Sequence, residues 1–195
     1  MKKAIALISI LAALTVPVLA NTSTTGLGIH LGQSFGYSLD ENVKNSNARS
    51  FDVTFNTAGG TTFYVHNEFG DFNIRDGQGG NVVEHVQGTE TVHGVGVLAN
   101  VAKTNVKLNV LIGSATTEIA AGQGAANIAG GAAYSSTNPI ADLGAGYHVN
   151  FGNAKLAMDI AYRHHLLKDN IDLRNNERLN NKSGIRFSAT VGYGF

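Results

Sequence analysis

Apolar and polar residues alternate one by one along several stretches of the chain. The first runs from Gly26 to Leu39, where leucine, isoleucine, phenylalanine and tyrosine recur at every second position except Gln33, between glycine, serine and histidine. Successive side chains of a β-strand point to opposite faces, so this pattern predicts a strand with one apolar and one small or polar face. Further stretches of the same kind lie at 50–56, 62–69, 90–100, 106–113, 141–151, 156–163 and 185–195.

The stretch 90–100 alternates less clearly than the others. Val95 and Val97 fall on the apolar face only if Val92 and Leu98 fall on the polar one. A β-bulge there would resolve the conflict, because one extra residue exchanges the two faces. The sequence leaves the in-or-out register of this strand open.

The connections between these stretches alternate in length. Long links are expected at about 40–48, 70–89, 114–138 and 164–183, and short ones at 57–60, 100–105 and 152–153. Strands of about ten residues, even in number, with long loops at one end and tight turns at the other are typical of outer-membrane barrels. A soluble sandwich has no reason to keep that order of long and short links.

The start of the chain has the features of a secretory signal peptide. Lys2 and Lys3 precede an apolar run at 4–16, and Val18 and Ala20 occupy the positions expected before a cleavage site. The run is shorter than the ~20 residues that a membrane-spanning helix needs. We therefore expect a signal peptide at 1–20 and a single domain at 21–195.

Two arrangements fit alternating strands in an exported protein. In a periplasmic β-sandwich or a lipocalin-like barrel the apolar face points inward, whereas in a membrane barrel it points to lipid. The second face here carries Gly, Ser, Asn, Asp, His, Lys and Arg, which suits a narrow polar lumen. The prediction is an all-β fold, an eight-stranded antiparallel up-and-down transmembrane β-barrel.

The end of the chain resembles the last strand of small eight-stranded outer-membrane barrels. This family includes the membrane domain of OmpA, OmpX and the opacity-type proteins. The resemblance rests on the alternating segment 187–195 and on 143–147 and 159–163, which are similar to the penultimate hairpin. It implies that Phe187, Val191, Tyr193 and the terminal Phe195 form the signal that the barrel-assembly machinery reads. The chain departs from the family in having no Trp, so any aromatic girdle must consist of Tyr and Phe.

The polar face carries enough charge to predict an ion network in the lumen. An eight-stranded barrel is just wide enough for side chains to fill it, and buried ions need partners. We interpret the network as structural, with the inward glycines leaving room for a narrow wet lumen. The predicted members are Asp52, Glu68, Lys107, Asp142, His148, Asp159, Arg163 and Arg186, together with His30 and His66.

Few features suggest enzymatic chemistry. The chain has no Cys, and its 14 basic and 14 acidic residues give no basic face for nucleic acid. His30 and Ser34 lie on one strand face and are the only hint of a lipid A-modifying enzyme, although the late Ser/His cluster of the deacylases is missing. His164 and His165 are adjacent and should point to opposite faces, against a metal site. We expect no catalytic residue, no metal and no cofactor.

The remaining candidates for function are the exposed loops. Loops on a rigid scaffold commonly carry binding sites. The expected function is a non-enzymatic, monomeric protein of the outer membrane of a Gram-negative-type bacterium, with a structural role and loops for adhesion. Its expected partners are outer-membrane lipid, lipopolysaccharide, the assembly machinery and a host or cell-surface ligand. A narrow porin-like channel is the alternative. Cations that could meet lipopolysaccharide phosphates are Lys168, Arg174, Arg178 and Lys182.

Overall fold

The computed structural model describes residues 25–39, 43–78, 81–101, 104–120, 133–167, 171–172, 178–179 and 182–195. The signal peptide predicted at 1–20 lies outside these residues. No helix in the part described is long and apolar enough to cross a membrane. The strands are β1 (Gly26–Ser38), β2 (Val43–Asn56), β3 (Thr62–Gln78), β4 (Asn81–Asn100), β5 (Val106–Ile119), β6 (Tyr134–Phe151), β7 (Ala154–His165), β8 (Ile171–Asp172), β9 (Arg178–Leu179) and β10 (Gly184–Gly194).

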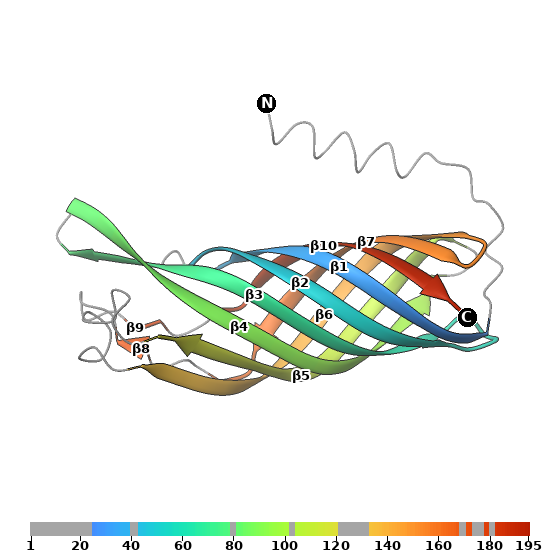
Figure 1. The fold of residues 1–195 in the computed structure, drawn as a ribbon, viewed down its shortest axis with the longest axis horizontal. Helices are drawn as coiled ribbons and strands as arrows, with labels where there is room; N and C mark the ends of the chain where they lie inside the picture. Colours follow the sequence, from blue (N-terminus) through green and yellow to red (C-terminus); the bar gives the residue numbers. More distant parts are fainter. Residues whose placement is uncertain are drawn as a thin grey trace, which may run out of the picture.

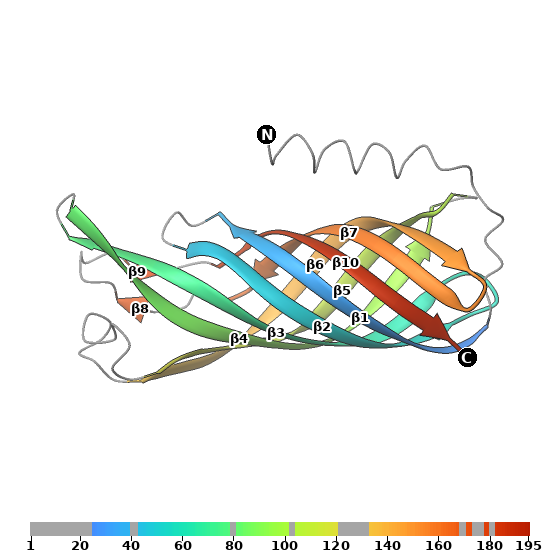
Figure 2. The same cartoon turned by 45° about the horizontal axis from the view of Figure 1, so that its top comes forward.

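Eight of these strands close into a barrel, seen from two sides in Figures 1 and 2. Their order around the barrel is β1-β10-β7-β6-β5-β4-β3-β2, and every neighbouring pair is antiparallel. The short strands β8 and β9 form a separate two-stranded sheet. The predicted fold class is therefore confirmed.

The strands are strongly staggered around the barrel. A ladder of paired residues that starts on β1 at Leu27 returns to β1 at Tyr37, ten residues further along. A barrel closed with such a stagger has strands tilted by roughly 35–45° to its axis. The ladder runs through Leu27, Phe55, Phe63, Val97, Val110, Leu143, Tyr162, Ile185 and Tyr37.

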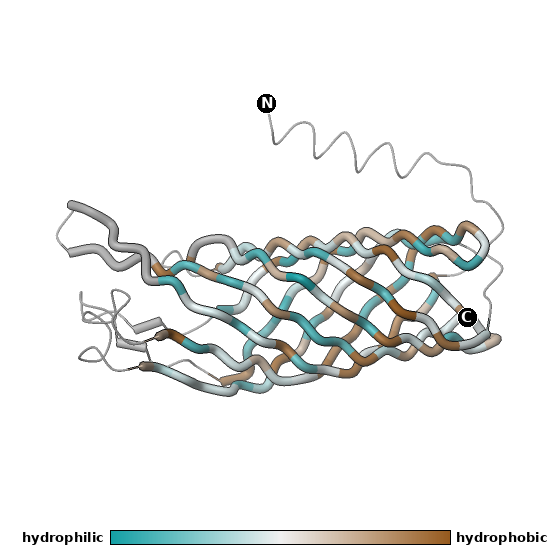
Figure 3. The backbone as a smooth tube through the Cα atoms, viewed as in Figure 1, coloured by the Kyte–Doolittle hydropathy of each residue, from teal (hydrophilic) through white to brown (hydrophobic). Residues whose placement is uncertain are grey.

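The outer wall of the barrel is apolar. Along the strands exposed and covered positions alternate, and Figure 3 shows the matching alternation of hydropathy along the chain. The members of the ladder just described face outward. All are exposed, for example Leu27 at 58% and Leu143 at 66%, except Val97, which is half-buried. So many exposed large apolar side chains would be costly in water, because each forfeits ~1.5–3 kcal/mol of burial.

Over 90–100, strand β4 follows the alternation without a bulge. Val92 and Leu98 are buried inside the barrel, while Val95 on the outside is 54% exposed. The pairing of β4 with β3 is regular from Thr62↔Leu98 to Gly77↔Val83. The bulge considered from the sequence is wrong, because the lumen has an apolar wall that accepts Val92 and Leu98.

The strands extend further at one end than the sequence indicates. β3 and β4 are 17 and 20 residues long, and only residues 79–80 separate them. A tilted strand needs about 9–11 residues to cross a bilayer, so this hairpin continues past the barrel wall, as Figure 1 shows. The long link predicted at 70–89 is thus almost entirely strand, and those predicted at 40–48 and 114–138 are strand in part. Over 71–74 the apolar side chains Phe72 and Ile74 are buried inward while Asp71 is exposed, so the apolar-outward pattern that identifies the wall in the sequence ends there.

The opposite end of the barrel, which we call the inner end, has tight turns. Gly152 adopts φ 61° in the two-residue link between β6 and β7, a conformation that favours glycine. The C-terminus lies at this end, where the amide of Gly194 donates to the carbonyl of Asn153 at 2.8 Å. The amide of Phe195 donates to the carbonyl of Leu27 at 2.8 Å, so the last residue also closes on β1. The end with the β3–β4 hairpin is the outer end.

Candidate functional site

The lumen gathers the ionisable residues predicted for it. His30, Glu68, Asp142 and Arg163 are buried, at 7%, 3%, 7% and 3% exposure, and the others are half-buried. They reach the lumen because they lie on the inward-facing positions of seven strands. The predicted residues found on inward positions are His30, Asp52, His66, Glu68, Lys107, Asp142, His148, Asp159, Arg163 and Arg186.

Arg163 on β7 is the centre of a cluster that crosses the lumen. Its Nε donates to the Asp142 carboxylate at 2.9 and 3.1 Å, and its Nη2 donates to Asp142 at 2.8 Å. Its Nη1 donates to Glu68 Oε1 at 2.9 Å. Asp142 is the cross-strand partner on β6, whereas Glu68 lies on β3, four strands away in either direction around the barrel. The Arg163–Glu68 bond therefore joins opposite walls.

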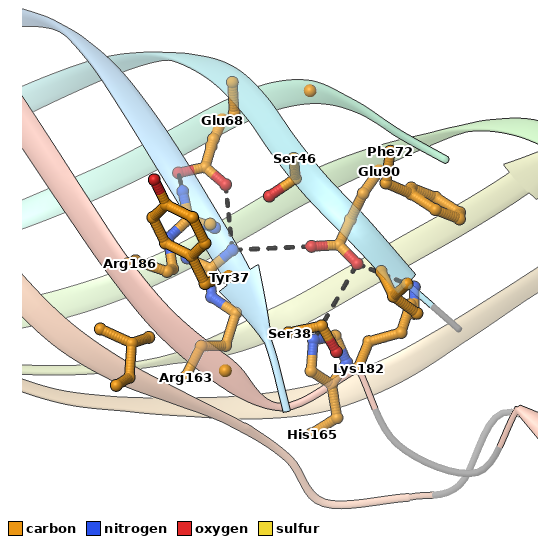
Figure 4. Close-up of a pocket in the computed structure, with 16 residues that line it drawn as sticks. Tyr37, Ser38, Ser46, Glu68, Phe72, Glu90, Arg163, His165, Lys182 and Arg186 are labelled. Atoms are coloured by element: carbon orange, nitrogen blue, oxygen red, sulfur yellow. Dashed lines mark hydrogen bonds and ion pairs between the residues drawn. The ribbon is translucent and has the colours of Figure 1, made fainter. Parts of the chain in front are cut away.

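Arg186 and Ser34 complete this cluster, which we call the outer plug (Ser34, Glu68, Asp142, Arg163 and Arg186). Arg186 on β10 donates to Glu68 and, at 2.5 Å, to the hydroxyl of Ser34. Figure 4 shows Glu68 between the two arginines. Two guanidinium groups and two carboxylates thus fill the same level of the lumen, each with an opposite charge beside it. Buried ions arranged in this way satisfy one another, and their bonds span the lumen from wall to wall.

Lys182 forms a second ion pair beyond the outer plug. Its Nζ lies 2.8 Å from Glu90 Oε2, donates to Thr117, and sits 4.9 Å from the centroid of the Phe72 ring. Lys182 is only 8% exposed, so the interpretation of this residue as a solvated loop cation for lipopolysaccharide is wrong. It folds back into the barrel because Glu90 offers a buried counter-charge. The side chains of Lys168, Arg174 and Arg178 lie outside the described residues.

Hydrogen-bonded pairs line the middle of the lumen. His66 and Asp52 are 2.6 Å apart, His148 and Asp159 are 2.9 Å apart, and the hydroxyl of Tyr64 donates to Asn109 at 2.5 Å. A cavity of about 70 Å³ lies among them. Polar walls around such a volume are suited to ordered water.

One side of the lumen is apolar. Tyr64, Val92, Leu98, Leu111, Ala115 and Ile140 pack together as a buried cluster. Inward glycines serve this packing more than they serve water: a β-carbon at Gly96 would collide with the Tyr64 ring, and one at Gly192 with the ring of His30. The expectation that these glycines leave the lumen open is therefore wrong at these positions.

Some residues of the site are not among those predicted from the sequence. Tyr64 and Glu90 lie in phase with inward positions, which is the signal that could have found them. Lys182 lies before β10 in a link that shows no alternation, so nothing in its surroundings indicates a lumen residue.

The histidine and serine candidates are placed as follows. His30 and Ser34 are both buried on the inward face of β1, but the Ser34 hydroxyl bonds to Glu68 and Arg186. His164 is exposed and His165 is 4% exposed, on opposite faces of β7 as predicted. Within the described residues no group of three or more His, Cys, Asp or Glu side chains is arranged to hold a metal ion.

The C-terminal residues face outward. Phe187, Val191 and Tyr193 are 38%, 60% and 47% exposed on the outer wall of β10, and Phe195 is 72% exposed just after it. Tyr193 and Phe195 contact each other edge to face at 5.3 Å between ring centroids. This geometry gives the last strand an apolar ridge along its lipid-side face.

Comparisons with known proteins support the fold. No protein-family model matches the chain, and no curated protein sequence gives a significant match. Among solved structures, neisserial surface protein A aligns with a TM-score of 0.52 and 12% identity, over 87% of this chain and 96% of that one. The outer membrane protein OprG from Pseudomonas aeruginosa aligns with a TM-score of 0.50 and 12% identity, over 91% and 99%. The chain therefore has the fold of the small eight-stranded outer-membrane barrels.

Proposed function

We propose that this protein is an integral, non-enzymatic barrel of the outer membrane of a Gram-negative-type bacterium, with a closed lumen and an outer end that binds other molecules. The observation that carries the proposal is the outer plug, which joins opposite walls of a barrel whose exterior is apolar. An apolar exterior is suited to contact with lipid acyl chains. An interior in which ion pairs join opposite walls is suited to a rigid support for the outer end. The partners are outer-membrane lipid, lipopolysaccharide and a host or cell-surface ligand.

The height of the apolar exterior supports the membrane assignment. On β1, Leu27, Ile29 and Leu31 face outward below Gln33, and further apolar side chains follow above it. A band of about 25 Å of apolar side chains is usual for outer-membrane barrels. We expect export by the signal at 1–20 and insertion by the barrel-assembly machinery, which would read Phe187, Val191, Tyr193 and Phe195.

The β3–β4 hairpin is the element best placed to bind a ligand outside the membrane. It extends past the other strands at the outer end and is paired to its tip, so it is a stable platform. Binding residues are commonly carried by such projections from a rigid scaffold. This position supports the proposal of an adhesive or interaction role for the outer end.

Two measurements test the proposal together. The folded protein should migrate differently from the boiled protein in a detergent gel, and the refolded protein should give no discrete conductance in a planar bilayer. A protein found as a soluble periplasmic monomer after export would overturn the membrane assignment. Steady conductance steps would overturn the closed lumen.

A shortened hairpin tests the binding role. Replacing residues 75–85 with Asn-Gly would join the Ile74↔Val86 pair by a tight turn that suits antiparallel strands. Heat-dependent migration should persist, while attachment of the bacteria to host cells should fall. Unchanged attachment by a folded, surface-exposed variant would contradict the adhesive role.

A narrow channel is the second candidate, and the cavity of about 70 Å³ in the polar lumen favours it. In that case Arg163→Ala should change the conductance of the refolded protein. For a lipid A-modifying enzyme, mass spectra of lipid A from cells with and without the protein should differ. We favour a non-enzymatic role because the Ser34 hydroxyl is engaged by Glu68 and Arg186.

A further inference from the structure

The inner end of the lumen holds a cluster of basic side chains that the proposed function does not use. We call it the basic mouth; it comprises His30, Lys107, His148 and Lys155, from four different strands. Lys107 and Lys155 lie one residue inside the first residues of β5 and β7, at the rim of the barrel. Together they line a cavity of about 20 Å³. Its wall also carries the polar side chains of Asn56, Thr62 and Asn150.

The two lysines lack the counter-charges that the outer half of the lumen provides. Among the described residues, no carboxylate lies within 4.0 Å of either ammonium group. Lys107 donates to the hydroxyl of Thr62 at 3.3 Å. The negative charge of Asp159 attracts Lys107, but the Asp159 carboxylate is already hydrogen-bonded to His148 Nε2 at 2.9 Å. Lys155 also acts on Lys107, so the two positive charges repel each other.

His30 provides an independent indication of a missing partner. The side chain is 7% exposed, and its Nε2 has no hydrogen-bond partner in the described part of the chain. The residue lines both the cavity of about 20 Å³ and the adjoining one of about 70 Å³. Buried polar atoms rarely stay unsatisfied in folded proteins, so a ligand atom or water belongs beside it.

We propose that the basic mouth binds a small oxyanion, a phosphate or a carboxylate, that enters from the inner end. Two ammonium groups supply the charge, and the imidazole of His30 can donate to an oxygen atom. The cavity holds a group the size of one water molecule, so one oxygen enters it and the rest of the ligand stays at the rim. Because the outer plug closes the far side, the anion is held and does not pass through.

Calorimetry on the purified full-length protein in detergent tests the site. Titration with inorganic phosphate, and separately with acetate, should show saturable binding of one anion in at least one of the two arms. Lys107→Gln and Lys155→Gln should each weaken it at least tenfold. Arg49→Gln is the matched control, because it removes the same charge from an exposed position on the outer wall of β2 and should leave binding unchanged.

The outcomes separate the sources of the ligand. Binding of phosphate alone supports a phosphate-bearing ligand, and binding of acetate supports a carboxylate. No saturable binding of either, or equal affinity in both lysine variants and the unaltered protein, overturns the proposal. An equal loss in Arg49→Gln also overturns it, since net charge would then explain the binding.

A second measurement tests whether the electrostatic potential at the basic mouth is positive. The chain has no Cys, so Asn150→Cys introduces a single thiol at the rim. A negatively charged thiol reagent should modify it at least tenfold faster than a positively charged one of similar size, and Lys107→Gln should reduce that ratio. Equal rates would contradict the site. The calorimetric and thiol-reagent results are independent of gel migration and conductance. Either the anion site or the proposed function can therefore be refuted without refuting the other.

Discussion

Removing the guanidinium of Arg163 should destabilise the barrel more than any other single change in the lumen. Arg163 is 3% exposed and bonds to both Asp142 and Glu68. In Arg163→Met, Glu68 keeps Arg186, but the Asp142 carboxylate loses the guanidinium that holds both of its oxygens. Leaving a buried charge without its partner costs about 3–5 kcal/mol. We expect a loss of that size in the free energy of unfolding.

A double variant shows whether the loss comes from the stranded charge. Adding Asp142→Leu to Arg163→Met replaces the ion pair with two apolar side chains and leaves Glu68 with Arg186. Such replacements are often neutral or favourable relative to the pair. The double variant should therefore recover at least half of the loss. Arg49→Met, at an exposed position on the outer wall, should show no loss.

Urea unfolding in lipid vesicles can measure these differences. The chain has no Trp, so the folded fraction should be read from heat-dependent gel migration instead of tryptophan fluorescence. Stability of Arg163→Met within 1 kcal/mol of the unaltered protein would refute the reasoning. A double variant less stable than the single one would also refute it, because the loss would then come from packing.

Four further variants test other parts of the structure. Val110→Lys, on the lipid side of β5, should cost about 2–4 kcal/mol in vesicle unfolding if it lies near mid-membrane, and a neutral effect would argue against lipid contact. Gly96→Val should cost about 1–3 kcal/mol, because it collides with the Tyr64 ring, and Tyr64→Ala in the same chain should relieve part of that cost. Arg49→Leu should stabilise the barrel by about 1 kcal/mol in the same assay, since it removes a cation from the lipid-side wall. Phe195→Ala should lower the amount of folded protein in the outer membrane while its unfolding in vitro changes little; equal amounts in cells would contradict the assembly role.

The alternation of residues was sufficient to predict the barrel wall. Where a strand separates lipid from a filled lumen, each side chain must suit either lipid or the lumen. The residue type therefore indicates which face of the strand the side chain lies on. Val95 and Val92 on β4 show the limit of this rule. The lumen is apolar along part of its wall, and there hydrophobicity no longer distinguishes inside from outside.

The sequence could not predict which residues form ion pairs across the lumen. Alternation identifies Glu68 and Arg163 as inward residues, but their bond depends on the closure that puts β3 opposite β7. The Glu90–Lys182 pair is harder still, since Lys182 lies outside the strands. A charge in a link is usually solvated, and only the folded structure shows that this one turns inward.

The cations at the two ends of the lumen differ in whether a carboxylate pairs with them, and this difference constrains function. At the outer end every cation of the plug has a carboxylate at bonding distance, so opening it requires separating buried ions at a cost of several kcal/mol. At the inner end Lys107 and Lys155 have no such partner among the described residues. An anion that arrives from the inner side therefore meets the positive charges of Lys107 and Lys155. A solute that arrives from the outer side meets the bonded ions of the outer plug. A barrel with this asymmetry is better suited to holding an anion at its inner end than to conducting one.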